Sequence, residues 1–169
     1  MLVYHGSYME IQMPDINYGR FNLDFGKGFY VTNLQKQADK WARRKWVRRK
    51  ELAKNQSPVV SVYEFKVDLL NILAFEGYTN EWLDFVVKNR ARNKGVAGHS
   101  YDAIFGNIAD DDVAAMVDEY MRLLSKGRVN EDVKRATLYQ LSFSKPNDQY
   151  CIATQKGINA LKFIESYEV

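Results

Sequence analysis

Short runs of apolar, mostly β-branched or aromatic residues predict β-strands spaced along the whole chain. The clearest segments are residues 2–7, 28–32, 59–66, 101–106, 149–153 and 162–169. In residues 8–13 apolar and polar residues alternate, which predicts a further strand. It should end at Pro14, whose missing N–H stops strand pairing. Residues 69–75 and 140–143 are strand-like as well, and we expect 69–75 to form a meander with 59–66.

Apolar residues at helical spacing predict helices between these strands. The first begins after Asn33, which suits an N-cap, and ends near the turn at 55–58. Its apolar positions are Leu34, Ala38, Trp41, Ala42, Trp46, Leu52 and Ala53. Others are expected at 80–93 behind a polar cap, after the acidic residues 110–112, and at 130–138. The helix after the acids has an inward stripe of Val113, Met116, Val117, Tyr120 and Leu124.

Helices and strands do not alternate regularly, which favours an α+β protein over a doubly wound one. We therefore expect a mostly antiparallel, split β-sheet with flanking helices. A chain of 169 residues is the size of one ordinary domain, and it shows neither a linker nor an internal repeat. The prediction is a single domain over residues 1–169.

Cysteine content and hydropathy bear on where the protein works. Cys151 is the single cysteine, so no internal disulfide can form. The chain moves from Met1 directly into a strand-like segment with no signal-peptide pattern. No apolar run approaches the ~20 residues needed to span a bilayer. These features predict a cytoplasmic protein that does not enter a membrane.

Positive charge gathers in one segment of the chain. Residues 36–54 carry nine Lys or Arg against Asp39 and Glu51, a charge of +7, whereas the whole chain is only +3. Such a cluster can hold a nucleic acid, another phosphate-bearing molecule or an acidic protein. The alternative is a solvated helix face, which most charge runs are.

Two glycine-containing segments suggest a ligand site. In the strand at 2–7, His5 can offer an imidazole hydrogen bond, and Gly6 lets a flat amide approach the backbone. In the stretch DFGKGFYVT, Gly28 permits a close approach and Tyr30 can stack on a planar heterocycle, with Phe29 turned to the core. For a lone His-Gly pair, a structural histidine is the alternative reading.

These two segments together resemble the ADP-ribosyltransferase superfamily. VYHGS followed by FGKGFYVTNLQKQADKWA is similar to the His-Gly strand and the Gly-x-Gly-aromatic-Tyr strand that form the NAD cleft of that superfamily. The second motif is nearly that of the poly(ADP-ribose) polymerases, and the diphtheria-toxin-like branch is defined by His, Tyr and Glu. The whole chain resembles a family of small bacterial proteins in that superfamily, through DFGKGFY, YDAIFGNIADDD and NDQYCIAT.

The resemblance implies roles for individual residues. His5 would hydrogen-bond a ribose hydroxyl of NAD, Gly6 would pair with the nicotinamide amide, and Tyr30 would stack on the nicotinamide ring. Ser7 would lie near a ribose, and Gln149 stands where the family has its glutamate. The implied catalytic residues are Gln149, Tyr30 and His5, and the implied NAD-binding set is His5, Gly6, Ser7, Gly28, Tyr30 and Gln149, with no metal.

Gln149 departs from the family pattern. Glutamine can hydrogen-bond the ribose, but it brings no negative charge to an oxocarbenium-like transition state. Asp148 is adjacent but points to the opposite face of its strand. Asp110 is kept as a further site candidate, although acids at a helix start mostly cap it. Cys151 as a nucleophile has little support, because it lies in an apolar run.

The resemblance thus predicts an NAD-binding protein that transfers ADP-ribose from NAD to a macromolecule, as an intracellular toxin with an antitoxin partner. Two alternatives stay open. One is a non-catalytic NAD-binding or interaction module, for which Gln149 in place of glutamate is the argument. The other is a nucleic-acid-binding protein that uses the basic helix at 36–54.

Overall fold

Two β-sheets carry the fold, and a backbone bridge joins them. In a computed structural model of the chain, the described residues are 1–49, 57–91, 99–107, 111–144 and 147–169. The first sheet has the strand order β1 (Leu2–Ser7), β3 (Val59–Phe65) and β7 (Leu161–Glu168). The second has the order β2 (Phe29–Val31), β6 (Asp148–Ile152), β5 (Ala103–Asn107) and β4 (Ile72–Ala74). The bridge pairs Tyr4 with Thr32, next to the ends of β1 and β2. The protein is therefore α+β with a split sheet.

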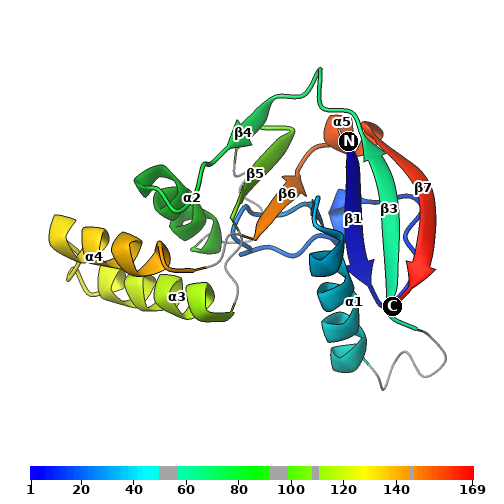
Figure 1. The fold of residues 1–169 in the computed structure, drawn as a ribbon. Coiled ribbons are helices and arrows are strands. Elements are labelled where there is room, and N and C mark those ends of the chain that lie inside the picture. The colour runs from blue at the N-terminus through cyan, green and yellow to red at the C-terminus, as the bar shows by residue number, and fades with distance from the viewer. Residues whose placement is uncertain (50–56, 92–98, 108–110, 145–146) are drawn as a thin grey trace.

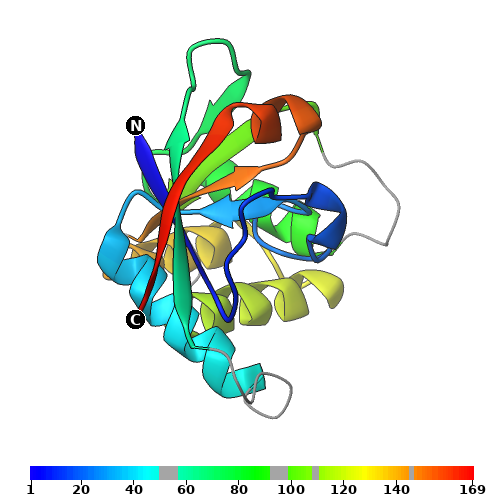
Figure 2. The ribbon, with the colours of Figure 1, turned by 90° about the vertical axis from the view of Figure 1, so that its right-hand side faces the viewer.

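Helices lie outside both sheets. They are α1 (Gln35–Arg49), α2 (Asn80–Arg90), α3 (Asp111–Ser125), α4 (Glu131–Leu141) and the short α5 (Gln155–Asn159), with a 3-10 turn at Ile16–Tyr18. Figure 1 shows β1, β3 and β7 side by side, with α1 beneath and α2, α3 and α4 gathered beyond the second sheet. Figure 2, turned by 90°, shows α1 running beside the three-stranded sheet.

Apolar side chains fill the spaces between these layers. Between the sheets, Val3 and Tyr63 of the first meet Phe29 and Ile152 of the second. A second cluster packs the other face of the four-stranded sheet against the helices, with the buried Trp82 of α2 among its largest members. A third, smaller cluster seals α1 onto the first sheet. Burial of this apolar area drives the layering.

One expected strand pairing is wrong. Residues 69–75 do not form a meander with 59–66, since β4 lies in the other sheet and runs parallel to β5. The remaining described pairings are antiparallel. A parallel pair needs a crossover connection, and α2 supplies it between β4 and β5. The strand pattern predicted a strand here but carried no information on its partner.

Two expected strands are also absent. Residues 8–13 form bends and loop, because the pairing of β1 with β3 ends where Ser7 lies opposite Val59, the first residue of β3. The segment is held through side chains, with the Ile11 N–H donating to Ser61 Oγ at 3.0 Å. Residues 140–143 are not a strand either, because α4 continues through Leu141 and turns follow. The buried Leu141 continues the apolar side of that helix.

The helix predictions hold with changes at their ends. Thr79 caps α2, accepting from the Trp82 N–H at 3.2 Å. Asn33 is not the cap of α1, since Leu34 follows it outside the helix and is 44% exposed. Leu52 and Ala53 lie outside the described residues. On α3, the stripe is buried at three positions, whereas Leu124 is 46% exposed. Within the described ranges, no helix has the length and apolar character to cross a bilayer.

Candidate functional site

The three side chains expected to form the site lie on neighbouring strands. The bridge between Tyr4 and Thr32, with N–O distances of 2.8 and 3.0 Å, brings β1 against β2. His5, one residue further on, places Nδ1 2.6 Å from the carbonyl oxygen of Tyr30. The order β1, β2, β6 is thus continuous at this point, although the first two strands belong to different sheets.

Gln149 reaches the same junction through β6. In the register of β2 and β6, Tyr30 lies opposite Cys151, and Thr32 Oγ1 donates to the Asp148 carbonyl at 2.9 Å. Two residues from Cys151, Gln149 therefore shares the face of Tyr30. Within the part of the chain that the structure describes, its buried side-chain amide has no hydrogen-bond partner.

The imidazole of His5 lies on the opposite face, between the two sheets. It stacks on Phe29 with ring centroids 4.3 Å apart and an interplanar angle of 21°. The prediction that Phe29 turns to the core is confirmed, whereas Tyr30 lies on the other face of its strand and packs against the apolar cluster beside the helices. The edge of β1 separates the histidine ring from the face that carries Tyr30 and Gln149.

Hydrogen bonding defines the proton position on His5. Its Nδ1 faces a carbonyl, which only accepts, so Nδ1 carries the hydrogen and Nε2 is left as an acceptor. Lys45 Nζ lies 3.3 Å from that Nε2 and donates to it. Burial, followed by the charge of Lys45, holds the pKa of His5 well below its usual value, against the bond to the Tyr30 carbonyl. His5 is a neutral acceptor at physiological pH.

Gly6 has a packing reason to be glycine. A Cβ there would come within 2.1 Å of the Ala38 carbonyl oxygen and 2.7 Å of the Ala42 nitrogen, both on α1. The N–H and C=O of Tyr4 point toward β2. Backbone groups two residues apart on a strand point in the same direction, so the N–H and C=O of Gly6 also face that side. Its carbonyl accepts a hydrogen bond from Lys45 Nζ at 2.7 Å. The Gly6 carbonyl, which the resemblance assigns to the nicotinamide amide, therefore accepts its hydrogen bond from Lys45 in this structure.

Lys45 is the residue that sequence reasoning missed. Burial, with a contribution from the charge of Arg20, lowers its pKa from 10.5 to about 8. A signal was present in the sequence: counted from Ala38 and Ala42 at helical spacing, Lys45 falls on the inward side of its helix. A lysine on the inward, apolar side of a helix predicts that its ammonium has specific hydrogen-bond partners there.

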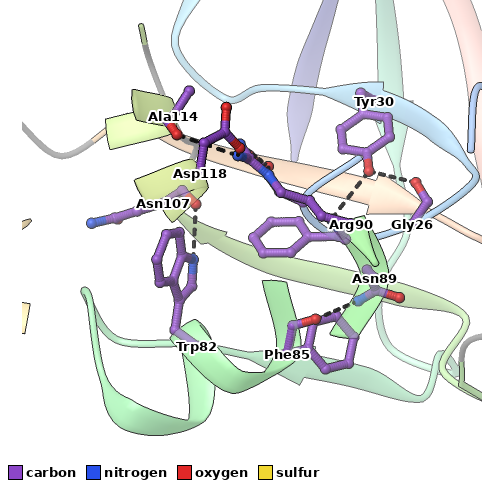
Figure 3. Close-up of polar contacts among 11 residues, drawn as sticks. Gly26, Tyr30, Trp82, Phe85, Asn89, Arg90, Asn107, Ala114 and Asp118 are labelled. Carbon is purple, nitrogen blue, oxygen red and sulfur yellow. Dashed lines mark hydrogen bonds and ion pairs between the residues drawn. The ribbon is translucent and has the colours of Figure 1, made fainter. Parts of the chain in front are cut away.

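Tyr30 is tied to the loop that precedes it. Its hydroxyl donates to the Gly26 carbonyl at 2.6 Å and accepts from the Phe25 N–H at 3.3 Å. Figure 3 shows the phenol reaching this turn, where Gly26 has a φ of +84°. Burial raises the pKa of Tyr30 well above its usual value, so the phenol stays protonated. One end of the ring is fixed, which positions its face.

An ion pair fastens the same loop to the helices. Arg90 of α2 meets Asp24 at 2.7 Å, and both side chains are largely buried. The guanidinium also contacts the exposed Asp118 of α3 at 2.8 Å, as Figure 3 shows. Three elements distant in sequence are thereby joined beneath Tyr30.

The remaining glycine and serine of the expected site contact the protein itself. At Gly28 a Cβ would lie 2.5 Å from Cys151 Sγ, so the close approach serves the packing of β2 on β6. Ser7 is buried at the end of β1, opposite Val59. Burial raises the pKa of Cys151 to about 12, which leaves the thiol unreactive.

The acidic candidates are not part of this junction. Asp110 lies outside the described residues. Burial raises the pKa of Asp148, which is only partly buried and lies on the face opposite Gln149. In the described ranges, no three His, Cys, Asp or Glu side chains come together as a metal site would require.

One further buried polar group borders β6. Gln37 of α1 donates through Nε2 to the Asp148 carbonyl at 3.3 Å, while its Oε1 is buried without a partner. Buried polar atoms are mostly satisfied, so this acceptor stands out. The sequence did not single out Gln37.

Comparison with known proteins adds a family match. The model of a family described as a protein of unknown function, DUF3990, matches residues 1–163. No curated protein and no solved structure matched the chain.

Proposed function

The chain belongs to the DUF3990 family, and for this member of it we propose an NAD-binding, ADP-ribosyltransferase-like function. The observation that carries the proposal is that His5, Tyr30 and Gln149 lie on the adjacent strands β1, β2 and β6, with the ring of His5 on one face and Tyr30 and Gln149 on the other. These positions are far apart in sequence, and they are the ones to which the motif resemblance assigns NAD. The α+β split-sheet architecture is compatible with that fold.

Two neutral groups on β1 are suited to the nicotinamide riboside half of NAD. The acceptor Nε2 of His5 can take the proton of a ribose hydroxyl, and the backbone of Gly6 presents N–H and C=O to an amide. In the structure Lys45 donates to both His5 Nε2 and the Gly6 carbonyl. Binding of NAD in this orientation therefore requires the ammonium to withdraw.

Two further groups lie across the strand edge. The ring of Tyr30 is held through its hydroxyl and packs against the apolar cluster beside the helices, and its stacking on the nicotinamide would contribute about 0.5–1.5 kcal/mol beyond burial. The amide of Gln149 can hydrogen-bond a ribose hydroxyl. Being neutral, it adds no charge stabilisation when the bond between nicotinamide and ribose breaks. Transfer would depend mainly on positioning, and we expect it to be slow.

The first experiment measures binding and turnover together. A thermal shift with NAD or nicotinamide reports binding, and radiolabelled NAD with cell lysate and nucleic acid reports transfer. Tyr30→Ala is expected to abolish both, whereas the exposed Tyr139→Ala should abolish neither. Gln149→Glu should accelerate transfer, since it restores the missing charge.

The outcomes separate the hypotheses. Label transfer that depends on Tyr30 supports an ADP-ribosyltransferase. Binding without turnover, in the native protein and in Gln149→Glu, supports a non-catalytic module. Absence of any shift with NAD or nicotinamide refutes the proposal. A toxin paired with an antitoxin is the biological setting we propose for an active enzyme, and growth arrest on expression that Tyr30→Ala relieves would test it.

A second candidate function is polyanion binding by α1. The helix exposes cations along its outer side, at Lys36, Lys40, Arg43, Arg44, Arg48 and Arg49. Clustered cations bind nucleic acid by releasing its counterions, so affinity falls steeply with salt. Titrating labelled nucleic acid at several salt concentrations tests this function independently of NAD. Affinity that is weak at low salt and insensitive to salt would exclude it.

A further inference from the structure

The ammonium of Lys45 lies at the end of β1, where the described residues give it two neutral acceptors. Lys45 Nζ donates to the Gly6 carbonyl at 2.7 Å and to His5 Nε2 at 3.3 Å, and both acceptors are neutral. Among the described residues, Lys45 has no acid within ion-pair distance. Elsewhere, the partly buried Arg90 and Lys134 both pair with aspartates. Lys45 is the exception to that pattern.

Other cations surround this ammonium. Arg20 is close enough for its charge to oppose protonation of Lys45. Arg49, one helical turn after Lys45, stacks its guanidinium over the ring of Tyr8 with a distance of 5.2 Å to the centroid. Tyr8 directly follows β1, so this stacking holds Arg49 beside the same strand end. Lys45 at the Gly6 carbonyl and Arg49 over Tyr8 therefore place two cations of α1 at the end of β1, and the charge of Arg20 acts on the first of them.

This arrangement raises the free energy of the folded protein as it stands. Partial burial removes part of the hydration of the ammonium, and the neighbouring cation adds repulsion. A lysine has three N–H donors, and Gly6 and His5 take two of them. The third donor and the uncompensated charge are what an oxyanion would satisfy.

We propose that Lys45, flanked by Arg20 and Arg49, forms a binding site for a phosphate-type oxyanion. The ammonium provides a charge-assisted hydrogen bond, and the two guanidinium groups add planar donors suited to phosphate oxygens. The anion can be free phosphate or the diphosphate of a nucleotide, because the recognising chemistry is the same. This site stands on the arrangement of the cations and does not require the proposed NAD chemistry.

The test compares anions and lysine variants at low salt. Inorganic pyrophosphate, inorganic phosphate and citrate are titrated by calorimetry into the native protein, Lys45→Met, Lys45→Arg and Lys40→Met. Lys40 is exposed on the same helix and serves as the matched control. We expect pyrophosphate to bind the native protein and Lys40→Met with the same affinity. Its affinity for Lys45→Met should be at least tenfold lower, and Lys45→Arg should regain the native affinity. Circular dichroism confirms that each variant is folded.

A second readout locates the anion on the lysine itself. Limited acetylation followed by mass spectrometry measures the reactivity of each amine, and pyrophosphate should protect Lys45 while leaving Lys40 unchanged. Equal binding by Lys45→Met and the native protein, or pyrophosphate that protects both lysines equally, overturns the proposal in favour of a diffuse charged surface. Failure of the native protein to bind any of the three anions overturns it as well.

Further arms separate this inference from the proposed function. ADP-ribose carries the diphosphate without nicotinamide, and nicotinamide riboside carries the ring without the diphosphate. Binding of ADP-ribose that requires Lys45, with no binding of nicotinamide riboside, supports the anion site and counts against the nicotinamide site. The reverse result rejects the anion site and leaves the nicotinamide site standing.

Discussion

Replacing Lys45 by methionine should change how the stability of the protein depends on pH. Methionine keeps much of the length of the side chain and removes its charge. The pKa of Lys45 is about 8 in the folded protein, against 10.5 for an ordinary lysine. Since one pKa unit corresponds to about 1.4 kcal/mol, the protonated side chain destabilises the fold by about 3 kcal/mol.

The sign follows from proton binding. Between pH 8 and 10.5 the unfolded chain retains the proton of Lys45 while the folded protein has released it. The free energy of unfolding therefore rises with pH in this window. Below pH 8 both states are protonated, and the folded state bears the whole cost. From pH 7 to pH 10, the native protein should gain about 2 to 3 kcal/mol relative to Lys45→Met.

Urea unfolding of the two proteins at intervals from pH 7 to pH 10 measures this difference. The buffers must lack phosphate, because an anion bound to Lys45 would raise its pKa. Lys40→Met controls for loss of an exposed charge, and its difference from the native protein should stay nearly flat. The reasoning is refuted if the difference between the native protein and Lys45→Met is equally flat across that range.

Three further changes test the packing beneath the site. Gly6→Ala should lower the free energy of unfolding by about 3 kcal/mol, because its Cβ would meet the Ala38 backbone at 2.1 Å; a loss under 1 kcal/mol in urea unfolding would contradict that contact. Asp24→Asn should cost about 2 kcal/mol in the same assay by leaving Arg90 short of a buried partner, and an unchanged midpoint would contradict this. Cys151 should resist a thiol reagent at pH 8 until denaturant is added, since its pKa is raised to about 12; rapid labelling of the native protein would show that the thiol is accessible.

Local patterns in the chain were enough to predict most helices and strands. The Thr79 cap and the helical spacing of Trp82 and Val86 predicted α2, and their hydrogen bond and burial confirm it. Runs rich in β-branched and aromatic residues predicted β1 and β3. These signals work because capping and one-sided burial involve residues only a few positions apart.

The partners of a strand are not encoded so locally. Ile72–Ala74 belongs to an apolar run that suits a strand, yet only the fold decides that it pairs in parallel with β5 and not with β3. The end of α4 was misjudged for a related reason. Leu141 suits a strand or a helix equally well, and its burial among the helices places it in α4.

The site shows the same division. Residue type and spacing were sufficient to single out His5, Tyr30 and Gln149 as the positions to examine. They were insufficient to show why both glycines must lack a Cβ. At Gly6 the reason is the packing of α1, and at Gly28 it is the contact with Cys151. Glycine permits close approach, but the sequence does not state what approaches.

By itself, the sequence determined an α+β chain with one strongly basic helix and two glycine-rich strand motifs, since composition and short-range periodicity are local properties. Helical spacing places Lys45 on the inward side of its helix, but only the tertiary structure decided that its ammonium meets His5 and the Gly6 carbonyl. The physical reason is that α1 crosses β1 closely enough for an ammonium at the end of a flexible side chain to reach the open edge of the strand. That distance depends on how the helix packs, which no local pattern specifies.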